Sequence, residues 1–315
     1  MKNYSNKIAI TTGDPNGIGA EITIKALNTL NIPPRDIVII SNSKVLNSYG
    51  SIQNNYEIIE VDYSAKVRPG EITKEAGDFA YRLLEKACEI KPKFIVTAPT
   101  SKEAMNLGGH SFSGQTEVLE KFLAHDGQKA EMLFASKDFR VLLLTRHIPL
   151  RDVSKTLTKK MIIEKIERLR SYFQNHLYIS KPSFALCALN PHAGENGLIG
   201  DEEEKNILPA IEAVRNRGIN ITNPLPADTL FINGVKNYLS GEKMPYDCYV
   251  ACYHDQGLIP IKTIAGNKTV NTTIGLDIIR TSPPHGTAFD IAGKNIANSE
   301  GMIEAIKQAL AVTNF

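Results

Sequence analysis

The chain has 315 residues, and a typical domain of about 150 residues predicts roughly two domains. Its 36 Lys and Arg nearly balance 34 Asp and Glu, giving a net charge of +2, and no clustered basic run disturbs that balance. This argues against a nucleic-acid binder that works by neutralising phosphates. Hydrophobic residues make up 42% of the chain, which excludes disorder over its bulk.

The sequence carries no sign of a membrane or an oxidising compartment. No apolar run reaches the roughly 18 residues of a membrane helix, and the apolar run near the N-terminus is too short for a signal peptide. Four cysteines are too few for a disulfide framework, so Cys88, Cys187, Cys248 and Cys252 are expected to be small buried thiols. We expect a cytoplasmic protein with neither nucleic acid nor membrane as a partner.

Strand-like apolar runs alternate with amphipathic helices along the chain. Their near-continuous apolar character is typical of strands buried on both faces and predicts an α/β fold with a mainly parallel sheet. The runs at 131–135 and 140–144 predict a hairpin, and Thr158 predicts a helix N-cap. Strands are expected over 7–12, 36–40, 94–97, 131–135, 140–144, 183–189 and 247–253, and helices over 21–30, 74–90, 158–177, 201–217 and 301–312.

Three histidines follow the ends of such strands. His147, His192 and His254 each come just past an apolar run, at the sheet edge where α/β proteins bind ligands. Three imidazoles there suit a divalent transition metal with an open position, and Asp255 could orient one of them or bind the metal itself. A single strand-end histidine is more often an ordinary turn residue, and no H-x-x-x-H spacing supports the metal site.

Other candidate groups are less specific. The turn at 13–19 leads from a strand into a helix, where it could hold an anion or form only a tight turn. It is neither a dinucleotide-binding G-x-G-x-x-G nor a P-loop. Lys262, Asn271 and Arg280 lie on consecutive segments and could bind phosphate or carboxylate, or be solvated surface groups.

Five motifs taken together resemble the 4-hydroxythreonine-4-phosphate dehydrogenase family of pyridoxal phosphate biosynthesis. They lie in order at 13–19, 145–152, 189–195, 224–229 and 253–257, nearly from end to end of the chain. The resemblance implies two α/β/α domains of the isocitrate/isopropylmalate dehydrogenase type with a cleft between them. It also implies a homodimer with its active site at or near the subunit interface.

The same resemblance implies how the chain is divided. One domain would comprise residues 1–125 and 282–315, with both chain termini and an adenosine-binding loop. The other, residues 126–281, would hold the metal ligands and the dimer contacts.

A second resemblance concerns the cofactor. Residues 285–294, followed by Asn298, are similar to the adenosine-binding loop of isopropylmalate dehydrogenases, which bind NAD without a Rossmann domain. Asp290 would accept hydrogen bonds from the ribose and favour NAD, although NADP remains possible. The implied cofactor residues are His285, Gly286, Thr287, Ala288, Asp290 and Asn298.

The family's other site residues carry over to this chain. The metal ligands fall on His147, His192 and His254, with zinc expected and cobalt, manganese, nickel or magnesium as alternatives. In the mechanism that we expect, Asp228 and Lys262 are our own candidates for the general base. The family commonly has His where this chain has Gln115, which cannot carry a charge, so either proton transfer there or the substrate differs. The implied substrate-binding residues are Gln115, Thr116, Lys262, Asn271 and Arg280.

The expected activity is metal- and NAD(P)-dependent oxidation of 4-phosphohydroxy-L-threonine at its secondary hydroxyl. Decarboxylation would then give 3-amino-2-oxopropyl phosphate. Three alternatives stay open: a dehydrogenase of a four-carbon sugar acid phosphate such as threonate or erythronate 4-phosphate, a metallohydrolase of small phosphate esters, and a ligand-binding protein without catalysis.

Overall fold

The computed structural model describes residues 2–125 and 127–313 and divides the chain into two compact units. The terminal unit comprises Met1–Ala130 and Val270–Phe315, and the central unit is Glu131–Thr269. The second border lies earlier than the predicted 281/282, because residues 270–282 form two strands of the terminal unit's sheet. Asp126, at the first predicted border, lies outside the described residues. Asn271 and Arg280 therefore belong to the terminal unit.

The terminal unit is built on a sheet in the order β3–β2–β1–β4–β11–β10. All neighbouring strands are parallel except β10 and β11, which pair antiparallel. β1, β2 and β4 are buried along their whole length, as their continuous apolar sequences predict. The strands are β1 (Ile8–Thr11), β2 (Ile37–Ser41), β3 (Glu57–Glu60), β4 (Phe94–Thr97), β10 (Val270–Ile274) and β11 (Ile279–Ser282).

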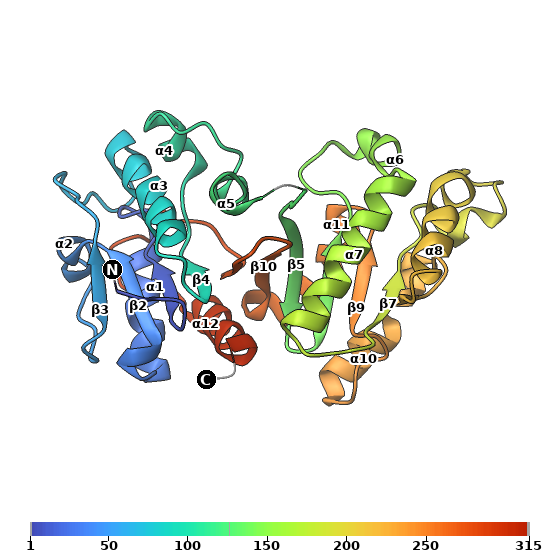
Figure 1. The fold of residues 1–315 in the computed structure, drawn as a ribbon. Helices are drawn as coiled ribbons and strands as arrows, with labels where there is room; N and C mark the ends of the chain where they lie inside the picture. Colours follow the sequence, from blue (N-terminus) through green and yellow to red (C-terminus); the bar gives the residue numbers. More distant parts are fainter. Residues whose placement is uncertain (1, 126, 314–315) are drawn as a thin grey trace. The chain divides into compact units, whose positions relative to one another are not determined.

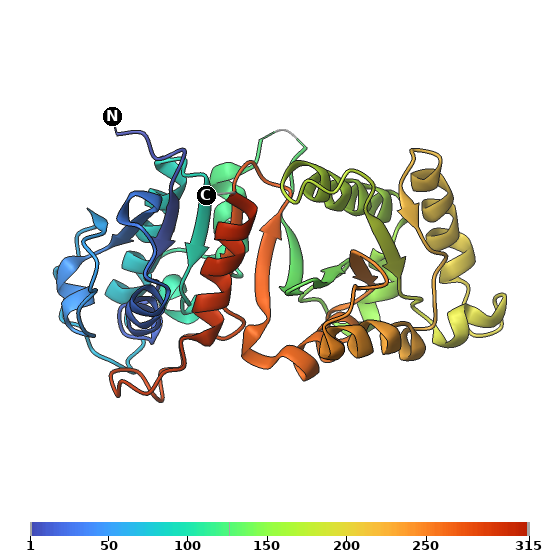
Figure 2. The ribbon, with the colours of Figure 1, turned by 90° about the horizontal axis from the view of Figure 1, so that it is seen from below.

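Helices cover both faces of this sheet (Figures 1 and 2). The C-terminal helix α12 packs on β4, β10, β11 and α1, while α3 packs on β1 and β2 and carries α4 and α5. The α-helices are α1 (Gly19–Leu30), α2 (Ser43–Asn47), α3 (Lys74–Glu89), α4 (Lys102–Leu107), α5 (Gln115–Leu123) and α12 (Glu300–Thr313), and Pro34–Asp36 forms the 3-10 turn η1.

The central unit has the strand order β5–β6–β9–β7–β8. β5 (Glu131–Ser136) and β6 (Phe139–Leu143) form the predicted hairpin. β6, β9 (Cys248–Ala251), β7 (Ser183–Leu186) and β8 (Asn220–Ile221) are parallel. The helices are α6 (Val153–Thr156), α7 (Lys159–Asn175), α8 (Leu208–Arg215), α9 (Ala227–Leu230), α10 (Ile232–Ser240) and α11 (His254–Ala265), with the short turns η2 (Leu150–Asp152), η3 (Pro191–Glu195), η4 (Glu203–Ile207) and η5 (Gly266–Lys268).

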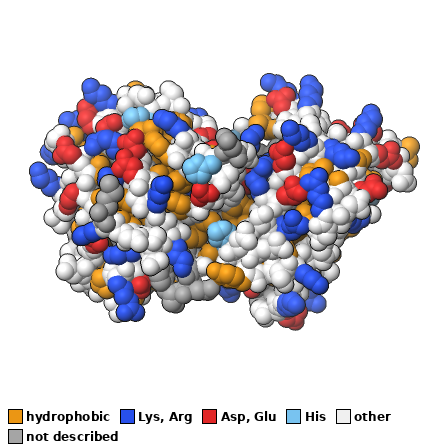
Figure 3. All heavy atoms as spheres, viewed as in Figure 1, with side chains coloured by type: hydrophobic (Ala, Val, Ile, Leu, Met, Phe, Trp, Pro, Cys, Tyr) orange, Lys and Arg blue, Asp and Glu red, His pale blue; other side chains and the backbone are white. Residues whose placement is uncertain are grey.

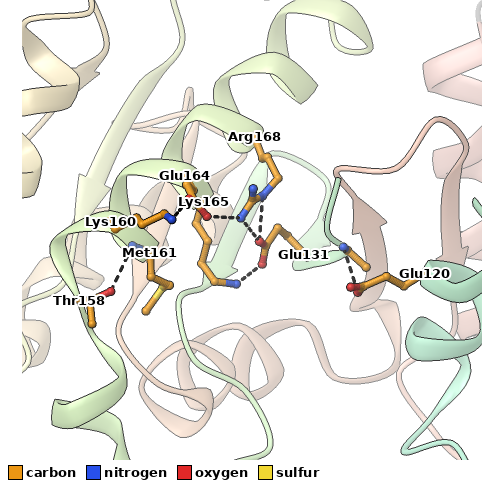
Figure 4. Close-up of polar contacts among 9 residues, drawn as sticks. Glu120, Glu131, Thr158, Lys160, Met161, Glu164, Lys165 and Arg168 are labelled. Carbon is orange, nitrogen blue, oxygen red and sulfur yellow. Dashed lines mark hydrogen bonds and ion pairs between the residues drawn. The ribbon is translucent and has the colours of Figure 1, made fainter. Parts of the chain in front are cut away.

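Helix α7 shows how the sequence fixes one of these elements. Its predicted cap is confirmed, because the Thr158 hydroxyl accepts a hydrogen bond from the Met161 amide at 3.3 Å. The side chains spaced by three and four residues, from Ile162 to Phe173, are fully buried. At the start of β5, the buried Glu131 carboxylate forms ion pairs with Lys165 and Arg168 and ties the helix to the sheet (Figure 4).

The predicted α/β class is confirmed, and several boundaries are corrected. The strands expected over 183–189 and 247–253 end at Leu186 and Ala251. The helix expected over 201–217 divides into the π-helical turn η4 and α8. Both strands of the β10–β11 hairpin went unpredicted because they are polar: Val-Asn-Thr-Thr-Ile and Ile-Arg-Thr-Ser.

The chemical character expected of the chain is also seen. All four cysteines are free and buried, and burial raises the pKa of Cys88 and Cys187 to about 12. On the face shown in Figure 3, acidic and basic side chains are interspersed. Within residues 2–125 and 127–313, no helix combines the length and the apolarity needed to cross a bilayer.

Gly77 lets α3 and α4 approach closely, and its replacement tests that packing. A Cβ at this position would lie 1.8 Å from the Ala104 carbonyl oxygen. Helix propensity alone favours Gly77→Ala by about 1 kcal/mol. Because backbone atoms would have to move, we expect the variant instead to lose about 2 kcal/mol of unfolding free energy in urea. Lys74→Ala, an exposed change on the same helix, is the control, and an equally stable Gly77→Ala would contradict the packing.

Candidate functional site

Two of the three strand-end histidines meet at one edge of the central sheet. β6 and β9 are parallel neighbours, and their pairing continues past the strands: the Leu144 amide donates to Ala251 O at 2.8 Å, and the Thr145 amide to Cys252 O at 3.1 Å. His147 and His254 follow directly, with ring centroids 5.7 Å apart. Both line a cavity of about 300 Å³ within this unit.

A carboxylate holds one of these imidazoles. His254 is the first residue of α11, and its Nδ1 lies 2.7 Å from Asp255 Oδ1. Such a contact leaves Nε2 as the nitrogen available to a ligand. Two close imidazoles, one with a carboxylate partner, fit the donor set of a divalent transition metal.

His192 does not join them within the chain. It lies beyond β7, the other neighbour of β9, in the turn η3, and its side chain is 69% exposed. Among the described residues, no three His, Cys, Asp or Glu side chains gather as a metal site. The expectation that three imidazoles converge is therefore not met in a single copy of the chain. The cause is the path of the turn, which carries His192 out into solvent.

The terminal unit holds a buried guanidinium. Arg280, on β11, is 4% exposed; its Nε donates to Thr97 Oγ1 at 2.8 Å and its Nη2 to Gln115 Oε1 at 3.0 Å. Burial lowers the pKa of Arg280 to about 9, so the group is charged at neutral pH. Among the described residues, Nη1 has no hydrogen-bond partner and can serve an anion.

Gln115 and Asn271 complete this polar group. Gln115 begins α5, and its Nε2 donates to Ala98 O at 3.0 Å, which fixes its oxygen toward Arg280. In the hairpin, Arg280 lies opposite Thr273, so Asn271 shares its face of the sheet. The Asn271 Oδ1 is buried without a partner among the described residues. The Arg280 guanidinium can bind an anionic group, and the Asn271 oxygen can accept a hydrogen bond from a donor on the same ligand.

The other predicted site residues are distributed between the units. Thr116 is buried in the first turn of α5, in the terminal unit. Lys262, on α11, and Asp228, on α9, are exposed in the central unit. The predicted substrate set therefore draws on both units.

The predicted adenosine loop packs beside the turn between β1 and α1. The Ile18 amide donates to Thr287 O at 3.0 Å, and a Cβ on Gly17 would lie 3.0 Å from Thr287 Cβ. His285 Nδ1 lies 3.1 Å from Gly286 O, while its Nε2 is buried with no partner among the described residues. Ala288 follows in the same loop with a φ of 43°.

The far end of this loop is exposed and leads into the last helix. Asp290, a predicted cofactor residue, is exposed. The Asn298 side-chain oxygen accepts from the Glu300 amide at 2.8 Å, at the start of α12. This contact gives Asn298 a structural role besides the predicted cofactor role.

Asp14, beside this loop, escaped the sequence reasoning. It is fully buried; Oδ1 accepts from the Asn16 amide at 2.9 Å, while Oδ2 has no partner among the described residues. Burial raises the pKa of this carboxyl to about 6, against the opposing effect of the neighbouring Asn16 and Ser101 backbone amides. The Gly-Asp-Pro-Asn string marked a turn, but its inward side chain depends on Gly13, whose φ of 70° lets it lie against Pro99.

His110, which lies between α4 and α5, has two partners in α3. Its Nε2 lies 2.9 Å from Asp78 Oδ1, and its ring stacks on Tyr81 with centroids 3.7 Å apart. These contacts hold the segment between α4 and α5 against α3. His110 therefore acts within the scaffold that carries Gln115.

Comparison with known proteins places the whole chain in one family. The family model for the pyridoxal phosphate biosynthetic protein PdxA matches residues 7–309. The chain belongs to the PdxA family. It is 41% identical to a 4-hydroxythreonine-4-phosphate dehydrogenase of Sulfurihydrogenibium sp., over 96% of this chain and 97% of that protein. It is also 38% identical to a D-threonate 4-phosphate dehydrogenase of Cupriavidus necator, over 98% and 97%.

Solved structures agree with this assignment. A 4-hydroxythreonine-4-phosphate dehydrogenase from Klebsiella pneumoniae is 35% identical, with a TM-score of 0.84 over 98% of this chain and 100% of that one. An isocitrate dehydrogenase from Methylococcus capsulatus is 16% identical, with a TM-score of 0.50 over 97% and 85%, and shares the fold alone. The predicted relation of this PdxA-family chain to the isocitrate dehydrogenase fold is confirmed.

The buried Asp14 predicts an unusual pH dependence of stability. Its pKa is raised on folding, so between about pH 4 and 6 the folded state keeps a proton that the unfolded state releases. Stability from this group is present at low pH and is lost as the pH rises, by about 3 kcal/mol in total. Asp14→Asn stays neutral, so we expect its unfolding free energy relative to the wild type to rise by about 2–3 kcal/mol between pH 4 and 7.

Urea unfolding at several pH values measures this difference. Ser51→Ala, at an exposed position with no ionisable side chain, is the control, and its difference from the wild type should not change with pH. A pH-independent difference for Asp14→Asn would show that the carboxyl titrates normally.

Proposed function

We propose that this PdxA-family chain is a metal- and NAD(P)-dependent dehydrogenase of 4-phosphohydroxy-L-threonine. It oxidises the secondary hydroxyl, and decarboxylation then gives 3-amino-2-oxopropyl phosphate. The observation that carries the proposal is the pairing of His147 and His254 at one strand edge in a chain so similar to enzymes of that name. The activity would take place in the cytoplasm.

In this proposal His147 and His254 hold the metal, zinc being the first candidate. When bound, a divalent metal polarises the substrate hydroxyl and stabilises the negative charge that develops when carbon dioxide leaves. The exposed His192 is the third donor. Because it does not meet the other two within one copy, a homodimer with the site at or near its interface supplies the missing imidazole. Asp255 keeps the ring of His254 oriented.

The chain's own charged groups bind and orient the substrate. Arg280 and Lys262 hold its anionic groups, since one provides a planar fork of donors and the other a flexible point charge. Asn271 offers an acceptor to a substrate donor, and Thr116 a hydroxyl near the start of α5. The hydroxyl proton passes to a base, for which Asp228 and Lys262 are the candidates.

The cofactor lies against the terminal unit. NAD accepts the hydride when bound. His285, Gly286, Thr287 and Ala288 hold its adenosine, and Asn298 supports the far end of the loop. Asp290 accepts from the ribose hydroxyls, and its charge would repel a 2′-phosphate, so NAD is favoured over NADP.

D-threonate 4-phosphate is the second candidate substrate. One observation favours it: a relative of that name is 38% identical to this chain. Threonate phosphate has a hydroxyl where the amino acid has an ammonium group. Gln115 cannot change its charge to suit one or the other, so the choice depends on the other groups of the site.

The assay is the formation of NADH from each phosphorylated substrate, followed by absorbance. We expect turnover with 4-phosphohydroxy-L-threonine that a chelator abolishes and that zinc, cobalt or manganese restores. His147→Ala and His254→Ala should each lose metal affinity by about 10–100-fold or more. Faster turnover of D-threonate 4-phosphate would favour the second candidate. Phosphate release without NAD would support a metallohydrolase, and NAD and metal binding without turnover a binding protein.

Gln115→Leu tests the role of the Arg280 site in substrate binding. The change leaves the Arg280 guanidinium and the Ala98 carbonyl without their partner, at a cost of about 1–3 kcal/mol. We expect KM for the phosphorylated substrate to rise about 10–100-fold, with a smaller change in kcat. Gln128→Leu removes an exposed hydrogen bond to Asp277 and should leave both constants unchanged. An unaltered KM for Gln115→Leu would remove this group from the substrate site.

A further inference from the structure

The turn that carries His192 has an unfavourable backbone. Six consecutive residues have positive φ: 53° at His192, 58° at Ala193, 80° at Gly194, 44° at Glu195, 55° at Asn196 and 87° at Gly197. Only glycine adopts this region freely, and left-handed runs are disfavoured for all other residues. A strained backbone of this kind is stable only where contacts with the surrounding structure hold it in place. Strained residues are concentrated at active sites and ligand sites.

One buried carboxylate holds the strand side of this turn. Glu203 is 2% exposed, and its Oε1 accepts from the backbone amides of Leu189 and Asn190, both at 2.8 Å. Its Oε2 accepts from the Asn190 side chain at 2.7 Å. Both oxygens are thus used, and every bond goes to the segment that leads from β7 into the turn.

The same carboxylate reaches the middle of the turn. A Cβ on Gly194 would lie 3.1 Å from Glu203 Oε2 and 3.1 Å from Gly200 O. Gly194 therefore lies confined between the carboxylate and the backbone of Gly200. Its φ of 80° is a second reason why this position favours glycine.

The local helix geometry around Glu203 is also unusual. Glu203 begins η4, a single π-helical turn that interrupts the helix expected over 201–217. π-turns add a residue to a helix and redirect side chains, often at functional sites. Here the inserted turn lies where the Glu203 carboxylate points away from solvent and into the loop.

We propose that Glu203 is a positioning residue that fixes the left-handed turn and thereby presents His192 to the metal. The inference rests on the proposed function only in taking His192 as a metal ligand. Glu203 itself touches neither metal nor substrate. It acts as a fixed acceptor for the backbone around Asn190.

Its neighbour Glu202 provides a matched control. Glu202 Oε2 also accepts from the Asn190 side chain, at 2.7 Å, but no backbone amide of the loop donates to it. Glu202→Gln and Glu203→Gln remove the same charge one residue apart. In Glu203 both carboxylate oxygens accept hydrogen bonds, from two backbone amides and the Asn190 side chain. Glu203→Gln leaves only one oxygen to accept them, because the new amide nitrogen is itself a donor.

Two readouts apply to the full-length protein. The first is hydrogen exchange of the backbone amides from 189 to 200, which needs neither metal nor substrate. We expect Glu203→Gln to accelerate exchange there by about tenfold or more, while Glu202→Gln stays close to the wild type. The second is titration with Zn²⁺ alone, in which Glu203→Gln should lose about 10–100-fold in affinity. When Glu203→Gln is saturated with Zn²⁺, its KM and kcat should return close to the wild-type values.

Each outcome decides one part of the proposal. Unchanged exchange in Glu203→Gln would overturn its role in holding the turn. Accelerated exchange with unchanged Zn²⁺ affinity would overturn the link to the metal, and with it the proposed ligand role of His192. If Glu203→Gln does not fold, Gly194→Ala perturbs the turn without removing the buried charge, since its Cβ would lie 3.1 Å from Glu203 Oε2, and should give the same two effects. A Gly194→Ala variant with normal exchange and normal Zn²⁺ affinity would contradict the proposal.

Discussion

The backbone pairing of β6 with β9 is the constraint on which the candidate metal site depends. The two parallel strands end in register, and their ladder continues for two more residues through Leu144 and Thr145. This backbone ladder by itself brings His147 and His254 to the same edge of the sheet. The sheet sets their separation, and Asp255 adds only the orientation of one ring.

The sequence predicted well wherever apolar periodicity decides the structure. The strands of continuous aliphatic residues, the α7 stripe and the Thr158 cap all lie close to where they were expected. It predicted poorly where polar residues are buried. β10 and β11 were not predicted because Asn271 and Arg280 interrupt them; β11 is a strand through its pairing with β4, and β10 through its pairing with β11. Propensity cannot anticipate such tertiary pairing.

The candidate site shows the same division. Strand-end placement located His147 and His254, because it follows from the geometry of parallel sheets. It does not determine where the His192 side chain lies, which depends on six positive-φ residues and a carboxylate eleven positions later in the chain. The residues that sequence reasoning overlooked, Asp14 and Glu203, are both buried acids. Both accept hydrogen bonds from backbone amides, and such contacts cannot be predicted from the sequence alone.

The placement of the central unit within the chain has a consequence for synthesis. That unit is one continuous stretch, Glu131–Thr269, whereas the terminal unit needs both ends of the chain. On the ribosome the first 130 residues emerge with the β4 edge bare and without α12, which covers β4, β10 and β11. The central unit is complete before β10 and β11 are synthesised. The terminal unit is therefore the first to begin synthesis and the last to be completed. Until then the nascent chain carries an open strand edge, which a cell must keep from pairing with its neighbours.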